Sequence, residues 1–146
     1  MPKPTEPYVH HYRLGFSDTD AARIAYTGRF AYFAMEAIEG WFRDRLGTDW
    51  FTLNVDEGIG TPFVHLALDF RSPLTPRDTV ATTVILARLG RSSLTFQLTG
   101  CVGERVSFEG KFVCVFVDGA QGTTIDIPIR YATAAQDEAA LAVAYS

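Results

Sequence analysis

The chain has 146 residues, of which 47% are hydrophobic and 21% are charged, and its formal net charge is −4. These values are typical of one globular domain, and the absence of a Lys/Arg cluster argues against nucleic-acid binding. No stretch reaches the roughly 20 apolar residues of a membrane-spanning helix. The first seven residues contain no apolar segment of a secretory signal, so we expect a cytoplasmic protein.

The first predicted element is a strand over residues 8–16, which follows a proline-rich tail over residues 1–7. A loop over residues 17–27 comes next. From Gly28 to about Leu46 the apolar residues recur with helical spacing, and Gly47 is a plausible C-cap. The first turns of this helix are apolar almost all round, so we expect other elements to enclose it.

A connector containing Trp50, Phe51 and Leu53 leads to four runs with strand character. These runs cover residues 63–70, 79–89, 92–102 and 105–117. The turns between the last three are short and require antiparallel pairing. Beyond Pro128 we expect a short helix or turn and then a frayed end. The pattern predicts an α+β domain over residues 8–133, with an antiparallel sheet wrapped around one long central helix and a C-terminal tail over residues 134–146.

The two cysteines, Cys101 and Cys114, lie inside strand-like runs, so we expect buried free thiols rather than a disulfide framework. Neither C-x-x-C nor H-x-x-x-H spacing occurs, which argues against a metal site. The chain also lacks the G-x-S-x-G motif of the α/β-hydrolases.

The loop before the helix carries two acids, Asp18 and Asp20. Exposed backbone N–H groups at a helix start favour negative charge, so a nearby carboxylate can attack a carbonyl, or direct water at it, while these groups hold the oxyanion. This arrangement indicates acyl transfer. In the alternative interpretation, the acids only cap the helix or a turn, where Asp is also favoured.

Three segments, in this order, resemble a known family: Phe16 with Asp18-Thr19-Asp20, Ile24 and Tyr26; Gly58-Ile59-Gly60-Thr61-Pro62; and Arg88-Leu89-Gly90-Arg91-Ser92-Ser93. Over residues 8–133 the chain is similar to the 4-hydroxybenzoyl-CoA thioesterase-like family of hotdog-fold acyl-CoA thioesterases. The resemblance implies that Asp20 is the catalytic carboxylate and that the backbone N–H groups of Thr27 and Gly28 receive the thioester oxygen. We interpret Asp18 as a structural residue or as a residue that supports Asp20 without touching the substrate. The chain departs from the family at Arg23, where Gly is common, and at Gly28-Arg29, where Pro-Asn is common.

The expected substrate-binding residues come from several segments. They are Tyr26, Trp50, Thr61, Phe63, His65, Arg88, Arg91, Ser92 and Ser93. The arginines and serines suit the phosphates or pantetheine of CoA, although an ordinary polar turn has the same composition. Trp50 and Phe63 can line an acyl pocket or belong to the core. The resemblance implies dimers or tetramers, in which Trp50, Thr61 or His65 of a partner complete each site.

The sequence thus predicts hydrolysis of an acyl-CoA, with an aromatic or a short to medium aliphatic acyl group, and no cofactor besides the CoA of the substrate. Three alternatives stay open. An acyl-carrier-protein thioesterase uses the same chemistry with a protein donor. A hotdog dehydratase usually needs a histidine at the site, and the loop before the helix contains none. A non-catalytic module would bind acyl-CoA without turnover.

Overall fold

A computed structural model describes residues 3–145. Along the chain, the elements are β1 (Tyr8–Arg13), the 3-10 turn η1 (Phe16–Asp18), α1 (Arg29–Trp41), its π-helical continuation η2 (Phe42–Leu46), α2 (Trp50–Val55), β2 (Ile59–Gly60), β3 (Phe63–Phe70), β4 (Thr79–Leu89), β5 (Ser93–Val102), β6 (Arg105–Val115), β7 (Val117–Asp118) and α3 (Ile129–Tyr145). None of the helices described in this range is long and apolar enough to span a bilayer.

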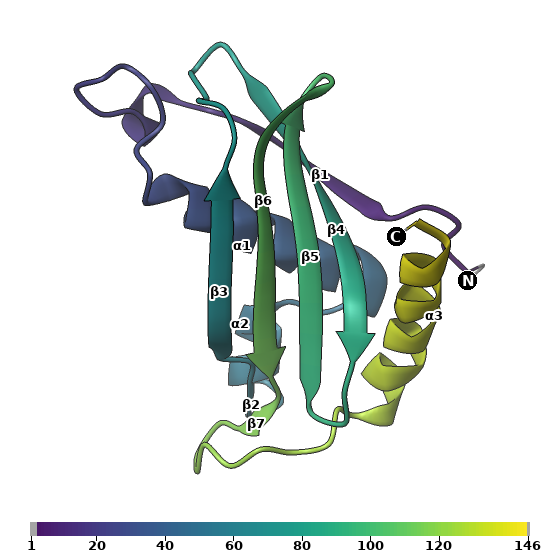
Figure 1. The fold of residues 1–146 in the computed structure, drawn as a ribbon. Helices are drawn as coiled ribbons and strands as arrows, with labels where there is room; N and C mark the ends of the chain where they lie inside the picture. The colour runs from purple at the N-terminus through teal and green to yellow at the C-terminus, as the bar shows by residue number, and fades with distance from the viewer. Residues whose placement is uncertain (1–2, 146) are drawn as a thin grey trace.

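The main sheet has five strands in the order β1-β4-β5-β6-β3, and all neighbours are antiparallel (Figure 1). The β4–β5 connection is tight, and the backbone N–H of Gly90 donates to the carbonyl of Ser93 at 2.8 Å. In the β5–β6 turn, Gly103 adopts a φ of +60°, which favours glycine. These short connections confirm the predicted meander.

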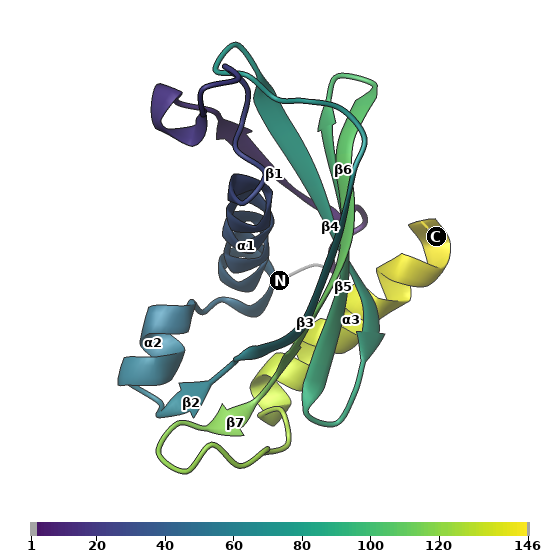
Figure 2. The same ribbon diagram turned by 60° about the vertical axis from the view of Figure 1, so that its left-hand side comes forward.

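The central helix α1 lies on one side of the curved sheet (Figure 2). Its Trp41 ring packs on Phe96 and its Phe30 ring on Phe108 of the sheet, with ring centroids 4.9 and 5.7 Å apart. Burying a side chain of this size contributes roughly 1.5–3 kcal/mol, so this layer is the main source of stability. The helix ends at Gly47, whose φ of +69° is left-handed. The prediction of an α+β fold with an antiparallel sheet and one central helix is confirmed, but within one chain α1 is not fully enclosed, since its Tyr32 is 44% exposed.

The prediction for the C-terminus is wrong, because Ile129–Tyr145 form one continuous helix that packs along β4 (Figure 1). The buried residues of α3 follow helical spacing. They are Tyr131, Ala135, Glu138 and Ala142. Because Glu138 is one of these buried residues, the sequence of α3 shows no continuous apolar stripe. Glu138 is only 4% exposed and accepts hydrogen bonds from Trp41 Nε1 at 3.1 Å and Arg45 at 2.9 Å, which offsets its burial.

Smaller corrections concern element ends. The first strand stops at Arg13 rather than residue 16, because the chain turns there into η1. The connector contains the helix α2, whose N-cap Asp49 accepts the Thr52 N–H at 2.7 Å. The last strand ends at Val115, since Val117 pairs with Gly60 in a separate two-stranded sheet. Both cysteines are free; Cys114 is buried and Cys101 is half-buried.

Candidate active site

The loop before α1 folds back on itself as a small hairpin. Thr19 and Ala25 form an isolated bridge, and the N–H of Asp20 donates to the Ile24 carbonyl at 3.1 Å. The N–H of Arg23 closes the turn on the Asp20 carbonyl at 2.9 Å. Among the described residues, Arg23 is the only non-glycine with a positive φ, at +68°. The turn therefore needs a left-handed residue where the related family commonly has glycine.

Asp18 joins this loop to the start of α1. It is 1% exposed, and its Oδ2 accepts hydrogen bonds from the Gly15 N–H and the Tyr12 hydroxyl, each at 2.9 Å. Its Oδ1 accepts from the guanidinium of Arg29. Burial would raise the pKa of Asp18, but the Gly15 hydrogen bond and the Arg29 cation outweigh it and hold this pKa below its ordinary value. Asp18 is thus engaged on both oxygens, which suits a structural role.

Asp20 differs from Asp18 in exposure and in its partners. Its side chain is exposed, and its Oδ1 accepts the Ala22 N–H at 2.8 Å, as in an Asx turn. Within residues 3–145, no hydrogen bond is made to the second oxygen, Oδ2. Asp20 lines a cavity of about 640 Å³ with Phe16, Thr19, Ala21, Arg23, Thr75, Pro76 and Arg77. The carboxylate therefore supports the turn with one oxygen and leaves the other open to the cavity.

Free N–H groups lie at the start of α1. The N–H groups of Arg29 and Phe30 donate to the carbonyls of Tyr26 and Thr27. In the described part of the chain, those of Thr27 and Gly28 donate no hydrogen bond. A Cβ on Gly28 would lie 2.6 Å from the exposed Tyr26 ring, so a larger residue here would displace this ring. Two unused donors at a helix start suit an oxyanion.

Thr27 opens onto a second cavity, of about 290 Å³. Its other lining residues are Ile24, Ala25, Phe30, Phe70, Arg71, Ser72 and Pro73. Both cavities lie between the loop and the segment of residues 70–77. A hydrogen bond of 2.7 Å from the Ala25 N–H to the Leu74 carbonyl ties the two segments together. Within one chain, Asp20 and Thr27 therefore line two cavities rather than one.

The other predicted residues form three further groups. Trp50, Thr61 and Phe63 line a cavity of about 350 Å³, in which the rings of Trp50 and Phe63 lie 5.8 Å apart. His65 on β3 and Tyr26 in the loop are both exposed. Trp50 is also part of the packing beside the core, so the two interpretations of this residue are compatible.

The turn with Arg88, Arg91, Ser92 and Ser93 lies at the opposite end of β4 from residues 71–78 (Figure 1). Arg88 and Ser93 line one cavity, and Arg91 lines another. Arg91 forms an exposed ion pair with Asp126 at 3.3 Å, and the Ser92 carbonyl accepts the Phe116 N–H at 2.7 Å. One chain does not bring this turn to Asp20.

The cluster around Asp18 and the place of Arg77 in the Asp20 cavity become visible only in the folded chain. Tyr12, Asp18 and Arg29 come from a strand, a loop and a helix, so no regular spacing links them. Arg77 follows Pro76 in a turn with no feature of a site. The usable signals were the departures from the family pattern at Arg23 and at Gly28-Arg29, because Arg29 is the cation that pairs with Asp18.

The sheet, the enclosed helix and the acidic loop at the helix start together define a hotdog protein. Residues 14–140 match the family model of the thioesterase-like superfamily, and the chain belongs to this family. A structure of a thioesterase superfamily protein from Jannaschia sp. CCS1 is 36% identical and has a TM-score of 0.86, with coverage of 94% of this chain and 96% of that one. The structure of a gentisyl-coenzyme A thioesterase is 27% identical and has a TM-score of 0.79, with coverage of 87% of this chain and 98% of that one.

A 1,4-dihydroxy-2-naphthoyl-CoA hydrolase from Picosynechococcus sp. is 32% identical over 71 residues, which are 49% of this chain and 48% of that protein. The matched part thus spans about half the length of that hydrolase. These relatives confirm the family resemblance found in the sequence and the hotdog fold.

Proposed function

We propose that this protein hydrolyses an acyl-CoA thioester to a free acid and CoA, with Asp20 as the reactive carboxylate. The observation that supports the proposal is that one loop carries both a carboxylate with one free oxygen and, at the start of α1, two unused N–H donors, on neighbouring cavities beside residues 70–77. Membership of the thioesterase-like superfamily supports thioester hydrolysis over other acyl chemistry. Both reacting groups come from the chain itself, so the reaction needs no metal or redox cofactor.

In this proposal, the thioester oxygen accepts hydrogen bonds from the N–H groups of Thr27 and Gly28. By one route, Asp20 Oδ2 adds to the carbonyl carbon, the C–S bond breaks, and CoA leaves as a thiolate that takes up a proton. Water then hydrolyses the resulting anhydride. By the other route, Asp20 takes a proton from water as the water oxygen adds to the same carbon; the C–S bond then breaks, and the CoA thiolate takes up the proton from Asp20. The products are identical.

The acyl group is proposed to be aromatic. The relatives at 27% and 32% identity are named for gentisyl-CoA and 1,4-dihydroxy-2-naphthoyl-CoA, which both carry aromatic acyl groups. Short or medium aliphatic acyl-CoAs and acyl-carrier-protein thioesters are the alternatives that a substrate panel must include. We keep a cytoplasmic location as a prediction that cell fractionation tests.

We also propose that the active unit is a homodimer, or a tetramer of two such dimers. The strand β3 is an edge of the sheet, and its Val64 and Leu66 are 62% and 52% exposed. An unpaired edge of this kind favours pairing with a second copy. Antiparallel pairing of two β3 strands places residue 63 of one chain toward residue 70 of the other. The partner's cavity around Trp50, Thr61 and Phe63 would then approach the loop with Asp20.

The test is turnover of aromatic and aliphatic acyl-CoAs, with free CoA detected as released thiol. We expect Asp20→Asn to lose roughly 10²-fold or more in kcat, the scale of acid–base contributions. Glu104→Gln is the matched control, because Glu104 is an exposed acid in the β5–β6 turn. Full activity of Asp20→Asn would overturn the mechanism. Binding of acyl-CoA without turnover by the parent chain would instead identify a non-catalytic module. Faster turnover on an acyl-carrier protein would identify the protein-bound donor.

A further inference from the structure

The cavity that holds Asp20 also holds two guanidinium groups, those of Arg23 and Arg77. Both side chains are exposed, and within the described residues neither forms an ion pair. Asp20 is the only carboxylate among the residues that line this cavity. The site is therefore locally cationic although the chain has a net charge of −4.

Other arginines at this end of the sheet are engaged by the protein. Arg13 Nε donates to the Pro76 carbonyl at 2.9 Å, Arg71 pairs with Glu109 at 3.2 Å, and Arg105 pairs with Asp78 at 3.7 Å. Arg23 and Arg77 have no such partner in the described part of the chain, so their positive charge is available to a ligand.

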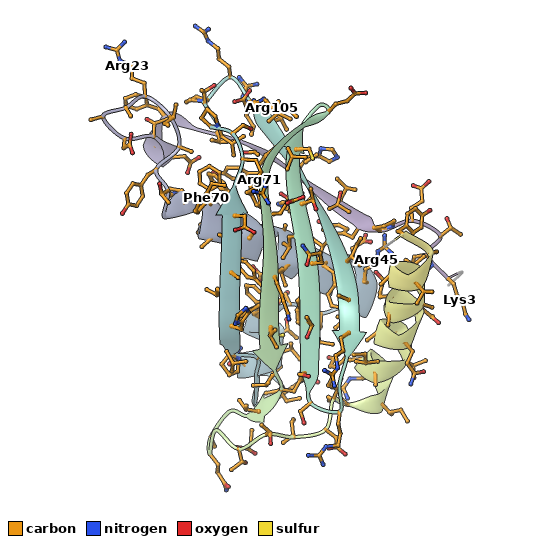
Figure 3. The ribbon with its side chains drawn as sticks, viewed as in Figure 1. Lys3, Arg23, Arg45, Phe70, Arg71 and Arg105 are labelled. Carbon is orange, nitrogen blue, oxygen red and sulfur yellow. The ribbon has the colours of Figure 1, made fainter. Side chains whose placement is uncertain are left out.

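Arg23 occupies an unfavourable backbone conformation. Its φ of +68° is one that glycine adopts freely and a branched or long side chain does not. The hydrogen bonds between Asp20 and Arg23 and between Asp20 and Ile24 hold it there. Figure 3 shows the Arg23 side chain extending from the tip of the loop. Backbone strain of this kind persists mainly at functional sites. Here a position that glycine would fill without strain carries a guanidinium group instead.

Arg77 is presented by a second, independently fixed segment. The N–H of Thr75 donates to the Asp78 carboxylate at 2.8 Å, and the N–H of Asp78 donates to the Thr75 carbonyl at 2.9 Å. The N–H of Arg77 also donates to the Thr75 hydroxyl at 3.2 Å. Two fixed backbones therefore direct two cations to one cavity.

We propose that Arg23 and Arg77 bind an anionic group of the substrate beside Asp20. This inference rests on the proposed thioesterase function and names a property of its substrate. Guanidinium groups suit carboxylate and phosphate oxygens equally, so the anion is either a carboxylate on the acyl group or a phosphate of CoA. In both cases the cations also offset the repulsion between Asp20 and the approaching anion.

The experiment uses matched thioesters: benzoyl and 4-carboxybenzoyl, or butyryl and succinyl, whichever pair the parent chain hydrolyses. Each acyl group is joined to CoA and to N-acetylcysteamine, which has no phosphate. The variants are Arg23→Gly, which removes the charge and suits the backbone, Arg23→Lys, which keeps a charge, and Arg77→Met. Arg43→Met is the control, since in the described part of the chain Arg43 forms an ion pair with Glu39 alone, and neither residue lines the Asp20 cavity.

We expect Arg23→Gly and Arg77→Met to raise KM about tenfold or more, the scale of a charged hydrogen bond, with kcat largely kept. Arg23→Lys should restore part of the loss. If the anion is a CoA phosphate, KM rises for both CoA thioesters and for neither N-acetylcysteamine thioester. If the anion is an acyl carboxylate, KM rises for the carboxylated substrates on both carriers. The KM effect should shrink at high salt.

Unchanged KM for all four substrates in both charge-removing variants would overturn the inference, and so would an equal rise for the neutral N-acetylcysteamine thioester. Calorimetric binding of CoA and of the free carboxylated acid gives a readout without turnover. A parent chain that neither hydrolyses nor binds these ligands refutes the proposed function itself. An active parent with unaffected arginine variants refutes only the role of Arg23 and Arg77.

Discussion

Arg29, the first residue of α1, donates hydrogen bonds through two of its nitrogens to the same carboxylate oxygen of Asp18, and the Nε contact is 2.9 Å. The guanidinium also lies 4.2 Å from the centroid of the Tyr32 ring, one turn further along the helix. The pair therefore connects the loop that carries Asp20 to the helix start that presents the N–H groups of Thr27 and Gly28. We infer that it positions both halves of the proposed site without touching the substrate.

Removing Arg29 should leave the buried Asp18 carboxylate without its cation. We expect Arg29→Met to lower the free energy of unfolding by about 2–4 kcal/mol, near the lower end for a broken buried pair because the Arg29 side chain is 34% exposed. Arg43→Met, which breaks an exposed pair with Glu39, should cost under about 1 kcal/mol. Urea unfolding of both variants provides the comparison. Equal effects would show that the Asp18–Arg29 pair behaves as a surface contact.

The stability of the fold should fall with acid through Asp18. Its folded-state pKa is lowered, so its contribution is present above the ordinary carboxyl value of about 4 and is lost as the pH falls through the lowered value. We expect the difference in unfolding free energy between the parent chain and Asp18→Asn to be constant from pH 7 to about 5 and to shrink below that. Urea titrations at several pH values measure this difference. A difference in unfolding free energy that grows as the pH falls would contradict a lowered pKa for Asp18.

The ion pair between Arg45 and Glu138 should be important for docking α3. Their side chains are 10% and 4% exposed, and a guanidinium nitrogen of Arg45 lies 2.9 Å from Glu138 Oε2. Arg45 is labelled beside α3 in Figure 3. Glu138→Leu removes the buried carboxylate partner of Arg45 and leaves it only the exposed Asp44 and the Glu6 carbonyl, so we expect a loss of about 3 kcal/mol in unfolding free energy. Asp137→Ala is the control on the same helix, because Asp137 pairs with the exposed Lys3. Comparable midpoints for the two variants in thermal unfolding would argue against this role.

The thiols should differ in reactivity, which matters for any assay that detects released CoA. Burial raises the pKa of Cys114 to about 12, and burial also raises the pKa of the half-buried Cys101. We expect Ellman's reagent to leave Cys114 unmodified in the folded chain and to titrate both thiols in urea. In Cys101→Ala, the folded chain should show no fast reaction. Rapid labelling of that variant would mean that Cys114 is accessible.

A charge on the edge strand should separate the proposed dimer. Leu66 is 52% exposed on β3, so Leu66→Glu should leave the fold of each chain intact. We expect sedimentation to report a smaller species and turnover to fall in parallel, because each site would lose the partner's Trp50 cavity. Glu104→Gln, away from this edge, should change neither measurement. Turnover that persists in a monomeric Leu66→Glu variant would show that one chain holds a complete site.

The sequence by itself determined the central helix, the antiparallel meander and the acidic loop at the helix start. Each depends on local information: the apolar spacing from Phe30 to Trp41, the short turns at Gly90 and Gly103, and the D-x-D segment at Asp18 and Asp20. The family resemblance predicted different roles for the two acids, and only the tertiary structure shows how their surroundings differ. Burial and the donors Tyr12, Gly15 and Arg29 engage Asp18, whereas Asp20 stays exposed.

Only the folded chain also showed that α3 is a long docked helix and that Arg23 and Arg77 meet in one cavity. The buried stripe of α3 contains Glu138, which is tolerated only because Trp41 and Arg45 approach from a distant part of the chain. Arg23 and Arg77 lie far apart in sequence and come together because the loop folds against the segment before β4. Contacts between remote segments have no local pattern, since they depend on the packing of the whole sheet around its helix.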